Sequence, residues 1–247
     1  MKWDKYVIIA VLGAIAFAIF QESNQGDPQA IARDPVTPNW AAIASWPGVE
    51  VDLVDARPDP NRRVTAIVLD DSGSMGEDIG PAKAAVVSAL EAMDAEDRVA
   101  VLALNAGTVL TFSSVSDAQS ALPDLLRPIS SDGGTPLARA IGEAQAMLES
   151  EAATVRGFGT FRLIVTTDGQ ADDGRALDSV IETLAASTPI QVTTIGIGIS
   201  GGHVLRRDDL GSFVDVANVA ALADALQAAV AENTDFTAIT DFQDTGG

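Results

Sequence analysis

Short apolar segments alternate with longer amphipathic ones between residues 62 and 232, and this alternation restricts the fold more than any other feature. The apolar segments are short and partly β-branched, as buried strands are, whereas the amphipathic segments have the spacing of helices. We expect strands at 64–70, 98–104, 108–112, 161–167, 190–196 and 213–216. We expect helices at 80–94, 117–126, 136–151, 173–186, 203–210 and 219–232. The pattern predicts a three-layer α/β fold in which a mostly parallel sheet lies between helices. We expect the segment 108–112 to be an antiparallel edge strand that pairs with 98–104.

The composition excludes several classes of function. The chain of 247 residues carries 35 acidic and 15 basic residues, which give a formal net charge of −20. Nucleic acid is therefore not an expected partner, because phosphate binding depends on clustered Lys and Arg. The chain has no cysteine, which rules out disulfides, thiolate zinc sites and a thiol nucleophile.

The first 20 residues resemble a membrane-targeting segment. Lys2 and Lys5 precede an uncharged stretch from Tyr6 to Phe20, and such a stretch extends about 22 Å as a helix. A cleaved signal peptide has a similar charged start and apolar length. However, the Ala-x-Ala sequence from Ala16 to Ala18 lies inside the apolar stretch, and the bulky residues Ile19 and Phe20 follow it. We therefore expect residues 1–20 to be an uncleaved signal anchor, that is, a transmembrane helix. Both readings send the rest of the chain across the membrane, to the periplasmic or extracytoplasmic side.

Two further segments flank the predicted domain at 61–232. Residues 21–60 contain six prolines and no helical period, so we expect a linker. Within it, Trp40 and Trp46 are expected to pin the linker onto the domain, or else to bind a partner, and 49–54 alternates as a short strand would. Residues 233–247 are polar and are expected to form a loose tail.

The first expected strand ends in a group of oxygen-bearing side chains. Asp70, Ser72 and Ser74 follow the apolar residues Val64 to Leu69 at alternate positions. In open α/β sheets, ligands bind at the carboxyl ends of the strands. Carboxylate and hydroxyl oxygens at such an end are the ligands that Mg²⁺, Mn²⁺ or Ca²⁺ prefers.

Two later segments add oxygen ligands of the same kind. Thr135 lies in the glycine-rich sequence Gly133-Gly134-Thr135-Pro136-Leu137, at the expected start of a helix. Asp168 ends a second apolar strand, in the sequence Thr166-Thr167-Asp168-Gly169. The alternative is that Asp70 and Asp168 only cap loops and bind no metal.

Together these motifs resemble the von Willebrand factor A (VWA) domain family and its metal-ion-dependent adhesion site (MIDAS). The family's Asp-x-Ser-x-Ser sequence corresponds to residues 70–74, its threonine to Thr135 and its second aspartate to Asp168. The resemblance covers about 170 of the 247 residues and implies a Rossmann-like domain with a complete MIDAS. One position departs from it: Asp71 stands where the family usually has an apolar or neutral residue. Asp71 either faces solvent or adds to the negative field of the site.

The resemblance also implies a function. The five side chains would bind Mg²⁺ (or Mn²⁺ or Ca²⁺), and one coordination position would stay open for an Asp or Glu carboxylate from a partner protein. We expect a membrane-anchored binding protein for adhesion or complex assembly, not an enzyme. One alternative is a metal-dependent hydrolase with Asp71, Asp132 or Asp172 as general base. Another is a subunit that works with a separate ATPase, because this chain has no Walker motif.

Several other features are weaker signals. Residues 196–201 match the G-x-G-x-x-G pattern, but they follow the fifth expected strand instead of opening a βαβ unit, so we expect close backbone packing and no nucleotide. His203 is the only histidine and is expected to be a loop or cap residue. Asp172 and Asp173 are expected to cap the helix at 173–186.

Overall fold

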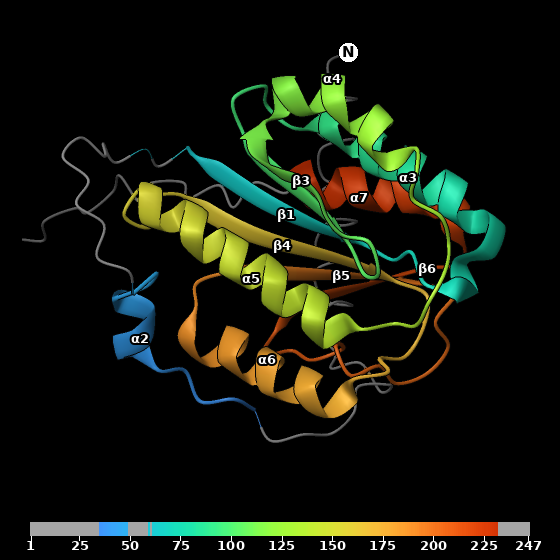
Figure 1. The fold of residues 1–247 in the computed structure, drawn as a ribbon. Coiled ribbons are helices and arrows are strands. Elements are labelled where there is room, and N and C mark those ends of the chain that lie inside the picture. Colours follow the sequence, from blue (N-terminus) through green and yellow to red (C-terminus); the bar gives the residue numbers. More distant parts are fainter. Residues whose placement is uncertain (1–34, 49–58, 60, 232–247) are drawn as a thin grey trace, which may run out of the picture.

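A computed structural model describes residues 35–48, 59 and 61–231 of the chain. One six-stranded sheet lies at its centre, in the order β3-β2-β1-β4-β5-β6 (Figure 1). The strands are β1 (Arg63–Leu69), β2 (Arg98–Ala103), β3 (Gly107–Ser114), β4 (Thr160–Thr167), β5 (Gln191–Ile197) and β6 (Gly211–Val216). All neighbours are parallel except β2 and β3, which confirms the predicted antiparallel edge strand.

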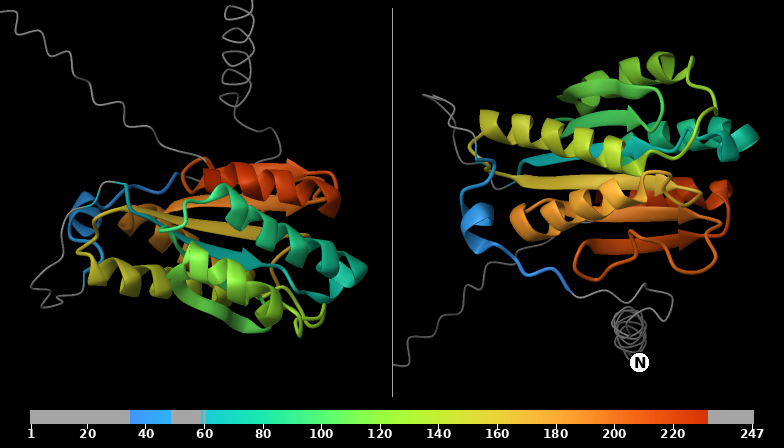
Figure 2. Two further views of the ribbon diagram at one scale, coloured as in Figure 1. Left: turned by 90° about the horizontal axis from the view of Figure 1, so that it is seen from above. Right: turned by 60° about the horizontal axis from the view of Figure 1, so that its bottom comes forward.

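Helices cover both faces of the sheet. The α-helices are α2 (Trp40–Ala44), α3 (Ile79–Ala89), α4 (Val115–Leu126), α5 (Leu137–Thr154), α6 (Gly174–Ser187) and α7 (Leu222–Ala231). Three short 3₁₀ segments are η1 (Gly73–Asp78), η2 (Leu90–Ala92) and η3 (Val219–Ala221). One core cluster joins α5 and α6 to the sheet, and a second joins α3, α4 and α7 to its other face. Figure 2 shows these three layers from two further directions.

The central strand β1 explains why the core has two halves. Its side chains alternate between the faces: Val64, Ala66 and Val68 pack toward α5, whereas Ile67 and Leu69 pack toward α3 and α7. All five are fully buried. A strand buried on both faces requires a continuous apolar sequence, and that is the pattern that predicted it.

One predicted helix is wrong. Residues 203–210 form turns, with hydrogen bonds from Arg206 N to His203 O and from Leu210 N to Arg207 O. Five consecutive residues, 203–207, are buried, so the segment has no exposed helical face. Arg206 binds the Asp215 carboxylate with both terminal nitrogens, and Arg207 binds Asp209. These ion pairs hold the segment in its turns.

The segment expected as a linker is ordered in part. Helix α2 lies within it, and Asn39 N donates to Ala186 O at 2.7 Å, which ties α2 to the end of α6. The Trp46 ring packs edge-on against Phe161 with 4.9 Å between the centroids, as expected. Trp40, in contrast, is 72% exposed, so its side chain is not buried against the domain as expected. Residues 1–20, 49–54 and 233–247 lie outside the described residues. Within the described ranges, no helix is long and apolar enough to cross a membrane.

Candidate metal site

Asp70 lies at the base of the site, where β1 ends beside β4. Its side chain is fully buried. One carboxylate oxygen accepts a hydrogen bond from Ser72 N at 2.9 Å, and the other accepts one from Asp168 N at 3.1 Å. Asp70 thus joins the loops that follow the two neighbouring strands, because both of its oxygens bind main-chain amides of those loops.

Ser72 and Ser74 follow Asp70 in the chain, and the Ser74 hydroxyl lies between the Ser72 hydroxyl and the Asp168 carboxylate. The two serine oxygens are 3.0 Å apart, and Ser74 Oγ donates to Asp168 Oδ1 at 2.7 Å. Adjacent ligands of an octahedral Mg²⁺ at 2.0–2.1 Å are about 3 Å apart. The separations of these three oxygens therefore suit neighbouring positions on such an ion.

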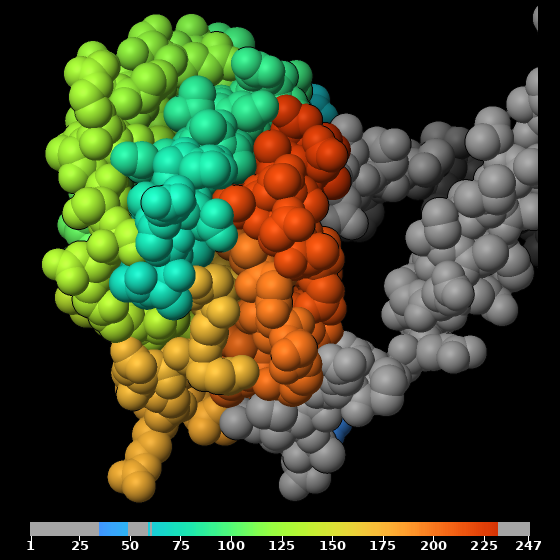
Figure 3. Space-filling view, turned by 90° about the vertical axis from the view of Figure 1, so that its right-hand side faces the viewer, coloured from blue at the N-terminus to red at the C-terminus, as the bar shows by residue number. Residues whose placement is uncertain are grey.

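Thr135 reaches the same region from the loop before α5. This loop lies against η1, because Gly73 N donates to Gly133 O at 3.0 Å. A Cβ on Gly169 would lie 4.0 Å from Thr135 Oγ1, so the hydroxyl is next to the residue that follows Asp168. On the face shown in Figure 3, the teal segment after β1 adjoins the yellow-green segment before α5 and the gold segment after β4.

The structure thus brings all five predicted side chains to one end of the sheet. Direct hydrogen bonds connect Asp70, Ser72, Ser74 and Asp168, and Thr135 lies beside them. Among the described residues, no group of three or more His, Cys, Asp or Glu side chains converges as a metal site would. A cation here would therefore depend on hydroxyl ligands as well as the two carboxylates. Such an all-oxygen set fits a hard divalent ion.

The electrostatics of Asp70 also suit a cation. Burial raises the pKa of the Asp70 carboxyl above its usual value, and the negative charge of Asp168 raises it further. The hydrogen bonds from Ser72 and Asp168 N oppose this rise. An ionised Asp70 is thus costly in the metal-free protein, and a divalent cation beside it would offset that cost.

Asp71 does not face solvent, because it is 2% exposed. One of its oxygens accepts from Asn105 N at 2.7 Å, and the other accepts from Ala106 N at 3.1 Å. Its own carbonyl accepts from Asp132 N at 2.9 Å. Asp71 therefore connects three loops at this end of the sheet: the one after β1, the β2–β3 turn and the one before α5.

The sequence predicts that Asp172 and Asp173 cap the helix at 173–186, but in the structure their carboxylates bind main-chain N–H groups at and before the start of α5. Asp173 stands at the N-cap position of α6, but its side chain makes no cap bond there. Instead its carboxylate accepts from Ala138 N at 3.1 Å and Arg139 N at 3.2 Å, and so it caps α5. Asp172 Oδ2 accepts from Thr135 N at 2.7 Å. Both aspartates thus bind main-chain N–H groups at the start of α5, more than 30 residues earlier in the chain. A local sequence pattern does not predict a contact over such a separation.

Gly196, the first glycine of the pattern at 196–201, allows close packing at the end of β5, as predicted. A Cβ on Gly196 would lie 2.8 Å from two ring carbons of Phe213, so the β5 backbone passes close to that ring. The Phe213 ring also lies 4.1 Å from the Arg206 guanidinium carbon and beside the His203 ring. Position 196 therefore requires glycine, because any side chain there would collide with the Phe213 ring.

His203 is a fully buried loop residue with a defined tautomer. Its Nδ1 accepts from Leu205 N at 3.1 Å, so the proton must sit on Nε2, which lies 2.9 Å from Gly169 O. Burial lowers the pKa of His203, and the nearby Arg206 lowers it further. The folded protein therefore holds the imidazole neutral.

A pH-dependent loss of stability follows from this neutral histidine. Because its folded pKa is below 6.5, its contribution to stability is present above about pH 6.5 and is lost as the pH falls. At pH 5.5 the loss is at most about 1.4 kcal/mol. Denaturant unfolding in EDTA at pH 7.5 and 5.5 measures it. We expect a smaller pH difference for His203→Asn, and an equal difference in both proteins would contradict the assignment.

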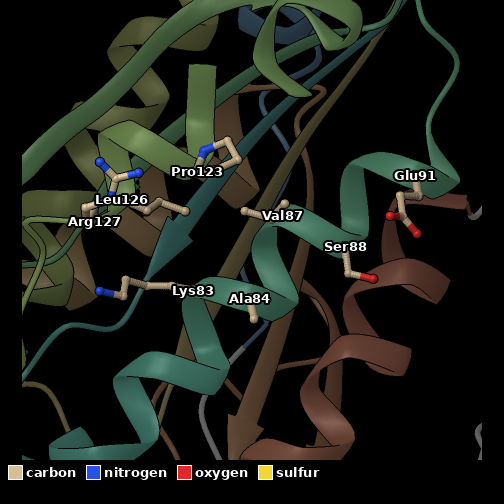
Figure 4. A pocket seen from close by; sticks show the side chains of 8 residues that line it. All are labelled: Lys83, Ala84, Val87, Ser88, Glu91, Pro123, Leu126 and Arg127. Carbon is tan, nitrogen blue, oxygen red and sulfur yellow. The ribbon is translucent and has the colours of Figure 1, made fainter. Parts of the chain in front are cut away.

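A groove separate from this site lies between α3 and α4. It has a volume of about 480 Å³ and is lined by Lys83, Val87, Pro123, Leu126 and Arg127 among others (Figure 4). Lys83 Nζ donates to Ile129 O at 2.8 Å, and Arg127 pairs with Asp124. Both cations at the groove thus already have partners within the chain, and none of the five predicted metal ligands lines it.

Comparison with solved structures shows the same fold in other proteins. A von Willebrand factor type A protein from Catenulispora acidiphila is 20% identical with a TM-score of 0.59, over 69% of this chain and 42% of that one. Proximal thread matrix protein 1 from the mussel byssus is 16% identical with a TM-score of 0.58, over 71% and 48%. The VWA domain of SpRpn10 is 13% identical with a TM-score of 0.52, over 66% and 93%. This chain thus spans less than half of the first two structures.

Sequence comparison gives the family. No curated protein matches the chain significantly. The family model for the von Willebrand factor type A domain matches residues 66–245, which is most of the chain. Domains of this family typically mediate protein–protein interaction or adhesion. From this match and from its six-stranded, mostly parallel sheet between two layers of helices, the chain belongs to the von Willebrand factor type A domain family.

Proposed function

We propose that this protein binds a partner protein through a divalent cation at a MIDAS formed by Asp70, Ser72, Ser74, Thr135 and Asp168. The supporting observation is the continuous set of hydrogen bonds that joins the two aspartates and two serines at the ends of β1 and β4. These side chains would hold Mg²⁺, or Mn²⁺ or Ca²⁺ in its place. The bound ion would attract an anionic ligand, because only two of the five side chains carry charge.

The ligand in this proposal is an Asp or Glu carboxylate of the partner. Asp168 and Ser74 lie at the surface side of the site, since Asp168 is partly exposed and Ser74 is exposed. Asp70 lies at the buried side. An incoming carboxylate would therefore approach the ion from the face shown in Figure 3.

A binding role is favoured over hydrolysis by what the three possible general bases already do. The Asp71 and Asp172 carboxylates accept main-chain N–H groups, and Asp132 Oδ1 accepts from Gly133 N at 2.7 Å. All three carboxylates thus hold loop backbone in place, Asp71 with both oxygens and Asp172 and Asp132 with one each, whereas a binding site needs no general base. We therefore propose a non-enzymatic module, and a separate ATPase partner remains compatible with it.

We further propose that residues 1–20 anchor the protein in a membrane and that the VWA domain faces the periplasmic or extracytoplasmic side. The support is the sequence alone: a charged start followed by fifteen uncharged residues from Tyr6 to Phe20. Mass spectrometry of the mature N-terminus tests the anchor. A protein that begins after residue 18 would show that the segment is cleaved.

Partner capture tests the binding proposal. We expect the tagged full-length protein to retain its partner in Mg²⁺ and to release it in EDTA, and we expect Asp168→Ala to release it in Mg²⁺ as well. Asp124→Ala is the matched control, because Asp124 is an exposed aspartate on α4 that pairs with Arg127 and is none of the five predicted ligands. A partner that remains bound in EDTA would overturn metal-bridged binding.

A further inference from the structure

The peptide unit between Gly134 and Thr135 is held at both of its polar atoms by side chains from two other loops. Its carbonyl oxygen accepts from Asn105 Nδ2 at 2.9 Å, and its N–H donates to Asp172 Oδ2 at 2.7 Å. Asn105 comes from the β2–β3 turn, and Asp172 comes from the segment between β4 and α6. Because a peptide unit is planar, two such contacts on opposite sides restrict its orientation strongly.

Asn105 is itself oriented by Asp71. Its Nδ2 lies 3.3 Å from Asp71 Oδ1 as well as near Gly134 O, and both neighbours are acceptors, so the amide nitrogen must occupy this position. Asp71 also accepts from the main-chain N of Asn105. The residue that departs from the family pattern therefore fixes the side chain that holds the 134–135 peptide.

The two glycines of the loop make these contacts possible. A Cβ on Gly133 would lie 2.6 Å from Asn105 Oδ1, and a Cβ on Gly134 would overlap Asp172 Oδ2. Asn105 and Asp172 thus occupy the space that side chains at 133 and 134 would need. The glycines permit close approach of two polar side chains to this backbone.

We propose that Asn105 and Asp172 are positioning residues that place the Thr135 hydroxyl as a metal ligand. The inference rests on the proposed metal site and deepens it. The restrained peptide contains the main-chain N of Thr135. Its restraint therefore fixes the position of the Thr135 side chain relative to Ser72 and Ser74 before the ion binds. Preorganised ligands bind a metal more tightly, and loss of an outer partner typically weakens metal affinity by about 10–100-fold.

Mn²⁺ binding to the full-length protein, followed by electron paramagnetic resonance, tests this role. We expect Asn105→Ala to weaken Mn²⁺ binding by about 10-fold, and to have no further effect once Thr135→Ala is present. Gln119→Ala is the matched control, because Gln119 also donates an amide hydrogen bond to a main-chain carbonyl, that of Leu90, outside the site. An equal loss from Asn105→Ala in both backgrounds, or no loss at all, would overturn the proposal.

Substitutions of Asp172 distinguish hydrogen bonding from charge. An asparagine oxygen can still accept from Thr135 N but carries no charge. We expect Asp172→Asn to retain most of the Mn²⁺ affinity that Asp172→Ala loses. Equal losses in the two variants would show that Asp172 acts through its charge and would contradict the positioning role.

Hydrogen exchange in EDTA separates this inference from the metal site itself. We expect Asn105→Ala to accelerate exchange of the Thr135 amide in the metal-free protein, because the opposite side of the same peptide is released. Unchanged exchange would overturn the restraint even if Mn²⁺ binds normally. If the restraint is confirmed but the wild-type protein does not bind Mn²⁺, the proposed metal site fails and the positioning role for a metal ligand fails with it.

Discussion

Saturating Mg²⁺ is expected to raise the melting temperature of the wild-type protein by about 5–10 °C, and Asp70→Ala is expected to abolish this rise. An ion at 100 times its dissociation constant stabilises the folded state by about 2.7 kcal/mol. In a domain of this size, 1 kcal/mol corresponds to about 2–4 °C. Asp70 is expected to dominate the effect because it is fully buried and its two oxygens hold the loops that carry Ser72, Ser74 and Asp168.

The raised pKa of Asp70 gives a physical reason for this stabilisation by a cation. Its pKa is raised in the folded protein, so the folded state binds its proton more tightly than the unfolded chain does. The corresponding stability is present below about pH 3.8 and is lost as the pH rises through the folded pKa. An ionised Asp70 is therefore a costly buried negative charge in the metal-free protein, and a cation beside it would offset this cost.

Asp97→Ala is the control for this prediction. Asp97 is also a buried aspartate, but it lies before β2 and pairs with Arg63 at the other end of the sheet. We expect Asp97→Ala to lower the melting temperature and to keep the full Mg²⁺-dependent rise. Thermal unfolding with Mg²⁺ or EDTA measures both. The metal site is wrong if Mg²⁺, Mn²⁺ and Ca²⁺ all leave the wild-type melting temperature unchanged.

Gly211→Ala is expected to cost about 3–5 kcal/mol of unfolding free energy, the sum of backbone strain and overpacking. Gly211 has a φ of 150°, which L side chains rarely adopt, and it pairs with Val192 in the register of β5 and β6. A Cβ there would overlap the Val192 carbonyl oxygen and lie 3.0 Å from its carbonyl carbon. Since the obstacle is main chain, relief requires the two strands to separate.

Gly174→Ala is the matched control for this substitution. Gly174 begins α6, and a Cβ there would meet nothing within 4 Å. Alanine at such a position is expected to stabilise the protein by about 0.4–1 kcal/mol, because the unfolded chain loses conformational freedom. Urea unfolding of both variants measures the difference. Equal stability of Gly211→Ala and the wild type would contradict the pairing of Gly211 with Val192.

Much of the site could be predicted from sequence because its ligands follow buried strands. The continuous apolar stretch of β1 identifies a strand covered on both faces, and Asp70 follows it directly. The same holds for β4 and Asp168. The prediction of a helix at 203–210 was wrong because it assumed an amphipathic segment with one buried face. In the structure every residue from 203 to 207 is buried, so there is no exposed face.

The sequence by itself determined the order of the six strands along the chain, the sheet class and the five oxygen-bearing side chains at the ends of strands and loops. Local hydrophobic pattern and turn chemistry carry this information over a few residues. Only the tertiary structure decided that Asp173 caps α5, that Asp71 is buried, and that Asn105 and Asp172 hold the peptide before Thr135. Those contacts join segments 29 to 37 residues apart. They depend on which strands become neighbours in the sheet, and the period of a single segment does not encode that order.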